Sequence, residues 1–292
     1  MAARMIELAS EHLSARIDPL GAELVSLRDA DARELMTDAD PAYWTGHAPI
    51  LFPIVGALNG GVYRLDGREY PLPQHGFARR STFEVIEQSG DAATLRLTDS
   101  EASRAVYPFA FALDVRHALD GPTLTTTVTA HNRGGRDMPA GIGFHPAFAW
   151  PLPYGRDRAD HRIVFNAEEP AKLARIVPGG LIGPADRESP LVGRTLALDD
   201  DLFAVDALVW QSIRSQSVRY GVEGAPQLRI DFPDTPMLGI WTKPGAAFVC
   251  VEPWHGIADP EGFAGEIWEK PGIKRLAPGE TWSVAMQVTL TH

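Results

Sequence analysis

Proline and glycine are spread along the whole chain, and their distribution limits the fold more than any other feature of the sequence. The 292 residues include 24 prolines and 27 glycines. Proline removes a backbone donor and clashes with the preceding helical turn, and glycine weakens a helix interior. Few windows could therefore hold an amphipathic helix of several turns. The sequence predicts few and short helices, at residues 99–105 and 200–208.

Alternation of apolar and polar residues takes the place of helical periodicity. It recurs in segments that are each typical of a half-buried strand: residues 94–98, 111–116, 124–128, 228–232 and 283–290. Asp66-Gly67 and Asp120-Gly121 predict hairpin turns, because both central residues of a type I′ turn need positive φ. Hairpins join antiparallel strands. We expect an all-β fold whose sheet is mainly antiparallel.

No repeat, low-complexity tract or change of composition divides the chain, so we expect one domain over residues 1–292. The formal net charge of −11 is spread along the chain without basic blocks, which disfavours nucleic acid or a membrane as partner. A single cysteine, Cys250, excludes an internal disulfide and is expected to be a small core residue. No stretch is typical of a signal peptide or membrane span, which predicts a cytoplasmic protein, as a monomer or weak homodimer.

One carboxylate closes an apolar run near the C-terminal end. Residues 246–251, AAFVCV, are expected to form a buried strand, and Glu252 follows them. A carboxylate in this place must be hydrogen-bonded, paired or engaged in chemistry, because burying an unpaired charge is costly. Alternation puts Glu252 on the same sheet face as Phe248 and Cys250. Pro253 is expected to end regular strand pairing.

The loop expected after this strand carries Trp254, His255 and Asp259. An aromatic plate with polar groups beside it is the composition of a wall that recognises a small polar ligand. Trp254 is therefore a predicted substrate contact, while the role of His255 stays open. Lys270, farther along, is expected on the surface.

Residues 43–61, YWTGHAPILFPIVGALNGG, contain an aromatic pair, an apolar strand and a Gly-rich turn. Most of this stretch fits a core strand followed by a hairpin. Trp44 and Asn59 are the exceptions, and both are predicted substrate contacts. Trp241, in GIWTKPG, fits the core equally well and is left out of the predicted site.

Two histidines lie in glycine-containing stretches. In PLPQHGFARRSTF, glycine beside His75 permits close approach of a ligand, and Arg79 offers a planar fork for hydroxyl or carboxylate oxygens. In PAGIGFHPAFAWPL, His145 is enclosed in an apolar run, which suits a proton donor or acceptor working near neutral pH. The remaining histidines are isolated among polar residues or near the termini and are expected to be surface or structural: His12, His47, His117, His131, His161 and His292.

HG at His75, HPAF at His145 and the strand ending in CVEPW at Glu252 resemble, in that order, the aldose 1-epimerase (galactose mutarotase) family. APILFPIVG, QHGFAR, GFHPAF and VEPWHGIAD together resemble its LacX-like bacterial branch, over nearly the whole chain. Each motif is weak alone, and the set is specific. The resemblance implies a large antiparallel β-sandwich (a galactose mutarotase-like supersandwich) with a concave face open to a sugar. It also implies a small-molecule sugar substrate, no metal or cofactor, and interconversion of the α and β anomers of an aldohexose.

Transferred to this chain, the resemblance implies that Glu252 is the general base and His145 the general acid, with His75 near the anomeric hydroxyl. The chemistry needs such a pair. Opening a pyranose removes a proton from the C1 hydroxyl and adds one to the ring oxygen, so a base and an acid must flank the same edge of the sugar.

The chain departs from galactose mutarotases at two sugar contacts. Their arginine after the strand that corresponds to ILFPIVG is missing, since Ala57 follows Gly56 here; Arg79 is the candidate replacement. Their aspartate–histidine contact is not recognisable, and Asp206 is the predicted contact from that region.

Three other readings stay open at this point. A hexose-6-phosphate 1-epimerase on the same fold would need Arg or Lys at the pocket rim, for which Arg79 and Arg80 are the available pair. A non-catalytic carbohydrate-binding protein would keep the aromatic wall, although amides would serve binding alone as well as Glu252 and His145. A two-histidine, one-carboxylate metal site would use His75, His145 and Glu252.

Overall fold

The computed structural model describes residues 4–291, so His292 lies outside the described residues. As predicted, helix is scarce. Within residues 4–291 there is one α-helix, α1 (Glu101–Val106), whose Ser100 side chain accepts a hydrogen bond from the Ser103 N–H. The second expected helix, at 200–208, is wrong in extent. It is a single 3-10 turn, Asp200–Phe203, because the chain extends again into the strand Leu208–Trp210.

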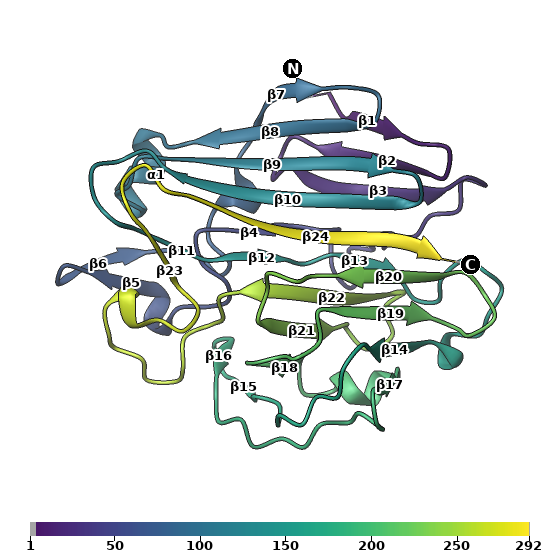
Figure 1. The fold of residues 1–292 in the computed structure, drawn as a ribbon. Helices are drawn as coiled ribbons and strands as arrows, with labels where there is room; N and C mark the ends of the chain where they lie inside the picture. Colours follow the sequence, from purple (N-terminus) through teal and green to yellow (C-terminus); the bar gives the residue numbers. More distant parts are fainter. Residues whose placement is uncertain (1–3, 292) are drawn as a thin grey trace.

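The largest sheet contains nine antiparallel strands, which Figure 1 shows stacked from β7 at the top to β17 at the bottom. The predicted alternating segments lie in it, and their inward apolar side chains are buried as the alternation requires, except for the half-buried Leu97. In sheet order the strands are β17 (Thr195–Ala197), β14 (Arg162–Phe165), β19 (Ser217–Gly221), β20 (Gln227–Asp231), β24 (Thr281–Thr291), β10 (Thr123–Asn132), β9 (Phe111–Asp120), β8 (Ala92–Thr98) and β7 (Glu84–Gln88).

A six-stranded antiparallel sheet and a three-stranded one pack against the nine-stranded sheet. The six-stranded sheet carries the site described below. It consists of β18 (Leu208–Trp210), β21 (Met237–Trp241), β22 (Phe248–His255), β12 (Ile142–Phe144) and β4 (Ile50–Leu51), with β13 (Ala147–Ala149) also paired to β22. The three-stranded sheet consists of β1 (Ile6–Ala9), β2 (Leu13–Asp18) and β3 (Glu23–Asp29).

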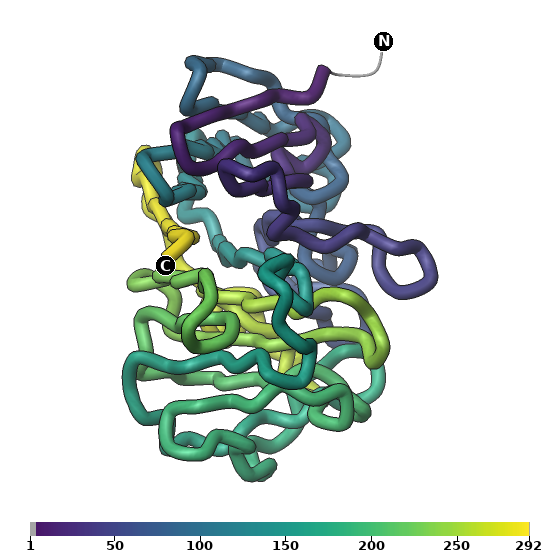
Figure 2. Tube along the Cα trace, turned by 90° about the vertical axis from the view of Figure 1, so that its right-hand side faces the viewer, coloured from purple at the N-terminus to yellow at the C-terminus, as the bar shows by residue number. Residues whose placement is uncertain are grey.

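Three two-stranded ribbons extend from these layers. They are β5 (Val62–Leu65) with β6 (Arg68–Pro71), β11 (Met138–Ala140) with β23 (Lys274–Leu276), and β15 (Ile176–Val177) with β16 (Leu181–Ile182). Figure 2 shows β1 to β3 at one end of the molecule and the green segment that holds β14 to β19 at the other. No helix among residues 4–291 is both long and apolar enough to cross a membrane.

The two predicted hairpins differ in outcome. Asp66 and Gly67 have φ of 54° and 73°, so the type I′ prediction holds between β5 and β6. Between β9 and β10, Asp120 is paired with Thr123. The central residues are therefore Gly121, at φ 53°, and Pro122. The prediction was displaced by one residue, because Pro122 supplies the fixed negative φ that follows the positive one of glycine.

The six-stranded sheet has two unlike faces. On β22, Val249 and Val251 point into the large core shared with the other two sheets. Phe248 and Cys250 point the opposite way and belong to a separate small cluster. Cys250 is buried, as predicted. Burial of the inner face stabilises the sandwich, and the outer face remains available for a binding site.

Candidate active site

Strand register brings Glu252 and His145 together. Gly143 on β12 lies opposite Trp254, and Ala147 on β13 lies opposite Cys250. The register on β22 is thus the same before and after the short interruption between β12 and β13. It places His145 directly across from Glu252, and residues in that relation project to the same face of a sheet. His145 Nε2 lies 3.1 Å from Glu252 Oε2.

The strand does not end at Pro253 as predicted. Pro253 lies within β22, opposite Leu238 on β21, and pairing continues through Trp254. Proline removes only one donor from the ladder and keeps an extended φ, so the neighbouring bonds hold the register. Trp254 is therefore a strand residue on the same face as Glu252.

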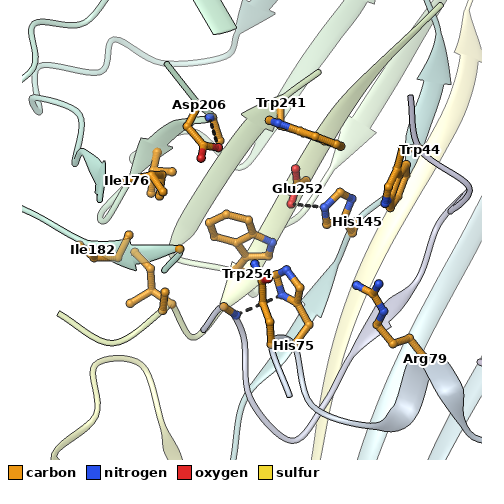
Figure 3. A pocket seen from close by; sticks show the side chains of 17 residues that line it. Trp44, His75, Arg79, His145, Ile176, Ile182, Asp206, Trp241, Glu252 and Trp254 are labelled. Carbon is orange, nitrogen blue, oxygen red and sulfur yellow. Dashed lines mark hydrogen bonds and ion pairs between the residues drawn. The ribbon is translucent and has the colours of Figure 1, made fainter. Parts of the chain in front are cut away.

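Glycines on the two neighbouring strands make room for the Trp254 indole. A Cβ at Gly239 on β21 would lie 2.5 Å from this ring, and one at Gly143 on β12 would lie 2.9 Å from it. Both distances are below van der Waals contact, so the ring occupies the space that side chains would fill. The indole lies next to Glu252 and forms part of a cavity wall (Figure 3).

The cavity has a volume of about 350 Å³. Figure 3 shows the Glu252–His145 pair between Asp206 and Arg79, which lie on opposite sides of it in this view. The cavity is lined by Trp44, Gly56, Gln74, His75, Arg79, His145, Ile176, Gly180, Ile182, Asp206, Ala207, Val209, Trp241, Glu252, Trp254, Ile257 and Ala258.

Seven of the eight predicted site residues line this cavity, and Asn59 is the exception. The prediction for Asn59 does not fit the structure. Its backbone N–H donates to Asp259 Oδ2 at 2.9 Å, and its side-chain Nδ2 donates to the Phe263 carbonyl at 3.0 Å. Asn59 begins the 3-10 turn Asn59–Gly61.

Trp241, which the prediction left out, also lines the cavity. Trp241 lies on β21, opposite Cys250 of β22. The centroid of its ring is 5.9 Å from the centroid of the His145 ring. Trp44 is closer, at 4.8 Å. In the sequence GIW, Gly239 and Trp241 lie on the same face of the strand. Only the pairing of β21 with β22 shows that this face is the one that carries Glu252.

The expectations for Asp259 and Lys270 were also wrong. Both side chains are buried, with exposed fractions of 3% and 1%, and they form an ion pair of 2.6 Å; neither lines the cavity. His255 lies outside the cavity too. Its Nδ1 is 3.1 Å from the Gly272 carbonyl, and its ring packs edge-on against Trp282.

The β15–β16 ribbon supplies cavity residues that the sequence did not suggest: Ile176, Gly180 and Ile182. The ribbon lies in the loop-rich region between residues 151 and 190, where no alternation predicts a strand. Its place beside β22 depends on contacts between distant segments, such as the hydrogen bond from Ile182 N–H to the Asp259 carbonyl. Gln74, beside His75, was likewise missed.

His75 is held by backbone geometry. It has a φ of 66°, and a Cβ at the following Gly76 would lie 2.2 Å from the Phe52 carbonyl oxygen, so only glycine fits there. The Gly56 N–H donates to His75 Nδ1 at 3.1 Å. Burial lowers the pKa of His75 well below its usual range. The ring is therefore neutral, with its proton on Nε2.

Burial acts on Glu252 and His145 in opposite directions. It raises the pKa of Glu252 well above its ordinary value, and the nearby charge of Asp206 adds to this shift. It lowers the pKa of His145 to about 3. Among the described residues, His145 Nδ1 has no hydrogen-bond partner. Glu252 becomes a stronger base and His145 a stronger acid than in water, in direct contact with each other.

The residues that could hold a metal differ from the predicted set. Donor atoms of His145, Cys250 and Glu252 lie within 4.8 Å of one another. His75 is not part of this group. The predicted site of His75, His145 and Glu252 is therefore not assembled among the described residues.

Comparison with known proteins agrees with this geometry. The family model for aldose 1-epimerase matches residues 4–289. The chain is 32% identical to the chromosomal and plasmid forms of protein LacX of Lactococcus lactis subsp. lactis, covering 98% of this chain and 99% of each relative.

Solved structures show the same fold. A galactose mutarotase related enzyme of Lactobacillus acidophilus superimposes with a TM-score of 0.91 at 30% identity, covering 99% of this chain and 98% of that one. A galactose mutarotase-like protein of Lactobacillus casei superimposes with a TM-score of 0.88 at 29% identity, covering 99% and 100%. The chain belongs to the aldose 1-epimerase family.

Proposed function

We propose that this protein is an aldose 1-epimerase that interconverts the α and β anomers of an aldohexose. One observation carries the proposal. A carboxylate and an imidazole lie directly opposite each other on neighbouring strands, 3.1 Å apart, at a cavity large enough for a small ligand. Ring opening needs one base and one acid at the same edge of the sugar, and this pair supplies both.

The reaction follows from the pair. Glu252 takes the proton of the C1 hydroxyl while His145 gives a proton to the ring oxygen. The bond between C1 and the ring oxygen breaks and an open-chain aldehyde forms. Rotation about C1–C2 presents the other carbonyl face to the C5 hydroxyl, and the proton transfers run in reverse as the ring closes.

The proton count is the same before and after opening. Before ring opening, Glu252 is a carboxylate and His145 an imidazolium. After ring opening, with the aldehyde in the cavity, Glu252 is a carboxylic acid and His145 a neutral imidazole. Burial favours the second, neutral form for both groups. The free enzyme reaches the reacting form by moving one proton across the contact between Glu252 and His145.

The remaining cavity residues supply binding. His75 offers an Nε2–H donor to a hydroxyl close to the pair, since its ring centroid is 5.9 Å from that of His145. Trp44 and Trp254 offer faces for the C–H side of the pyranose. Asp206 can accept from sugar hydroxyls, and Arg79 can donate to them.

Polarimetry tests the function. Freshly dissolved α-D-glucose and α-D-galactose are followed with the wild type, with Glu252→Gln and without protein. We expect faster relaxation with the wild type only. Failure of the wild type to accelerate relaxation of any sugar in an aldose panel, 6-phosphates included, would refute the proposal.

Arg79 favours a second candidate, a hexose-6-phosphate 1-epimerase. Its side chain lines the cavity, and none of the ion pairs found within residues 4–291 includes its guanidinium. Burial and the neighbouring Arg80 lower the pKa of Arg79, and the charge of Glu23 opposes them only in part, so an anion beside the guanidinium would offset the lowering further. A planar guanidinium can bind a phosphate through two parallel hydrogen bonds.

Two matched variants separate the candidates. Arg79→Ala removes the cavity cation, whereas Arg80→Ala removes an exposed neighbour that does not line the cavity. If phosphate is bound, Arg79→Ala raises KM for a hexose 6-phosphate by about 10-fold or more and hardly changes that of the free hexose. An equal rise for both sugars assigns Arg79 to hydroxyl binding. Unchanged KM values would remove Arg79 from the site.

A further inference from the structure

Asp259 and Lys270 form a buried ion pair, and Asp259 directly follows a residue that lines the cavity. Lys270 Nζ donates to Asp259 Oδ1 at 2.6 Å, and the side chains are 1% and 3% exposed. A buried pair costs desolvation of both charges and is weak evidence of a gain in stability. Its position next to Ile257 and Ala258, which line the cavity, suggests that the pair acts on the site.

Asp259 joins three separate segments. Its N–H donates to the Ala57 carbonyl at 2.9 Å, and its carboxylate accepts from the Asn59 N–H at 2.9 Å. Its carbonyl accepts from the Ile182 N–H at 2.9 Å. One residue thus ties the end of β22 to the turn after β4 and to the β15–β16 ribbon. Lys270 neutralises the carboxylate at the centre of these contacts.

The turn held by Asp259 is the one that orients His75. Gly56 directly precedes Ala57 and has a φ of 76°. A Cβ on Gly56 would lie 2.4 Å from Ala258, so the backbone of Gly56 rests on the residue before Asp259. Gly56 and His75 exchange two hydrogen bonds, from His75 N–H to the Gly56 carbonyl at 2.9 Å and from Gly56 N–H to His75 Nδ1 at 3.1 Å.

We propose that Lys270 is a positioning residue that acts through Asp259 and the Gly56–Ala57 turn to hold His75 with its proton on Nε2, facing the substrate. The role of His75 toward the sugar rests on the proposed function. The orientation and tautomer of the His75 ring do not.

The tautomer gives a test that needs no turnover. Nitrogen-15 NMR of the His75 ring is compared in the wild type, Lys270→Met and Lys172→Met. Lys172 is the matched control, because it pairs with Glu188 at the surface, where the two side chains are 52% and 79% exposed. We expect an Nε2–H signature in the wild type and control, and a mixture of tautomers in Lys270→Met. An unchanged signature in Lys270→Met would overturn the proposal.

A double-mutant cycle tests the coupling to catalysis. Lys270→Met is expected to lower kcat/KM by about 10-fold when His75 is present, the lower end of the loss seen when the partner that orients a metal-binding histidine is removed. In a His75→Gln background the same change should cost less than about 2-fold. Equal losses in both backgrounds would assign Lys270 a general structural role and overturn the proposal.

Two controls keep the outcomes separate. If Lys270→Met does not fold, Asp259→Asn combined with Lys270→Met removes both buried charges and carries the same measurements. If the wild type fails to accelerate mutarotation while the tautomer still depends on Lys270, the proposed function fails and the positioning role stands. If the wild type accelerates mutarotation but the His75 tautomer is the same in Lys270→Met, the positioning role fails and the proposed function stands.

Discussion

Two buried carboxylates lie close together in the chain, Glu252 within β22 and Asp259 just after it, and they are only 3% and 2% exposed. Asp259 is paired with Lys270. Burial lowers the pKa of Lys270, and the charge of Asp259 opposes this shift. Glu252 is matched by His145, whose own pKa burial lowers to about 3. Both regions contain a buried carboxylate, and the two carboxylates differ in the partner beside them: a lysine for Asp259 and a histidine for Glu252.

The difference separates structure from chemistry. The Asp259–Lys270 pair holds fixed charges and joins backbone segments. The Glu252–His145 pair can lose its charges by moving one proton between its members, and it faces the cavity. A buried carboxylate is therefore a candidate for catalysis when its partner can exchange a proton with it.

The largest expected effect concerns kcat. Replacing His145 by glutamine keeps a polar side chain but removes proton transfer to the ring oxygen, so kcat should fall by about 10²–10⁴-fold. Polarimetry measures the loss, and circular dichroism checks the fold. Lys270→Gln is the contrasting variant. The comparison breaks if it costs as much kcat as His145→Gln.

The next effect concerns stability. Lys270→Met leaves Asp259 as an uncompensated buried charge, and the free energy of unfolding should fall by about 3–5 kcal/mol. The same substitution at Lys172, in an exposed ion pair, should cost about 0–1 kcal/mol. Urea denaturation gives both values. Equal losses at the two lysines would mean that the Asp259–Lys270 pair has no special place in the fold.

The smallest effect is the pH dependence of stability. Because burial raises the folded-state pKa of Glu252, its contribution is present below the ordinary value of 4.5 and is lost as pH rises above it. Glu252→Gln removes this loss. Its stability relative to the wild type should rise with pH above 4.5, with a limiting slope of about 1.4 kcal/mol per pH unit.

His145 has the opposite sign and serves as the check. Burial depresses its pKa from 6.5 to about 3, so its contribution is present above 6.5 and is lost as pH falls toward about 3. His145→Gln should flatten the stability curve in that acid range, as urea denaturation at several pH values would reveal. A flat difference for both variants would show that neither group has a shifted pKa.

Much of the fold could be predicted from the sequence because alternation is a local signal. Every segment chosen on that basis lies in the nine-stranded sheet. The six-stranded sheet was less visible, since its strands are short and its register joins distant parts of the chain. The continuation of β22 through Pro253 depends on its neighbours and could not be inferred from the proline alone.

The site was predictable to the extent that motifs carry it. His75, His145 and Glu252 lie in distinctive stretches, and the structure places all three at one cavity. Trp241 needed the pairing of β21, and the β15–β16 ribbon has no local pattern. Lys270 was missed because an isolated lysine in a sequence is normally exposed, and only the fold reveals its carboxylate partner.

The shared register of β12 and β13 on β22 separates two features of the site that can change independently. The distance between Glu252 and His145 is set by backbone pairing, so substitutions of the surrounding side chains do not change it. The walls made by the β15–β16 ribbon and by Arg79 belong to connecting segments that do not set that distance. If the proposed function holds, substitutions in those segments can change which sugar is bound while the distance between Glu252 and His145 stays the same.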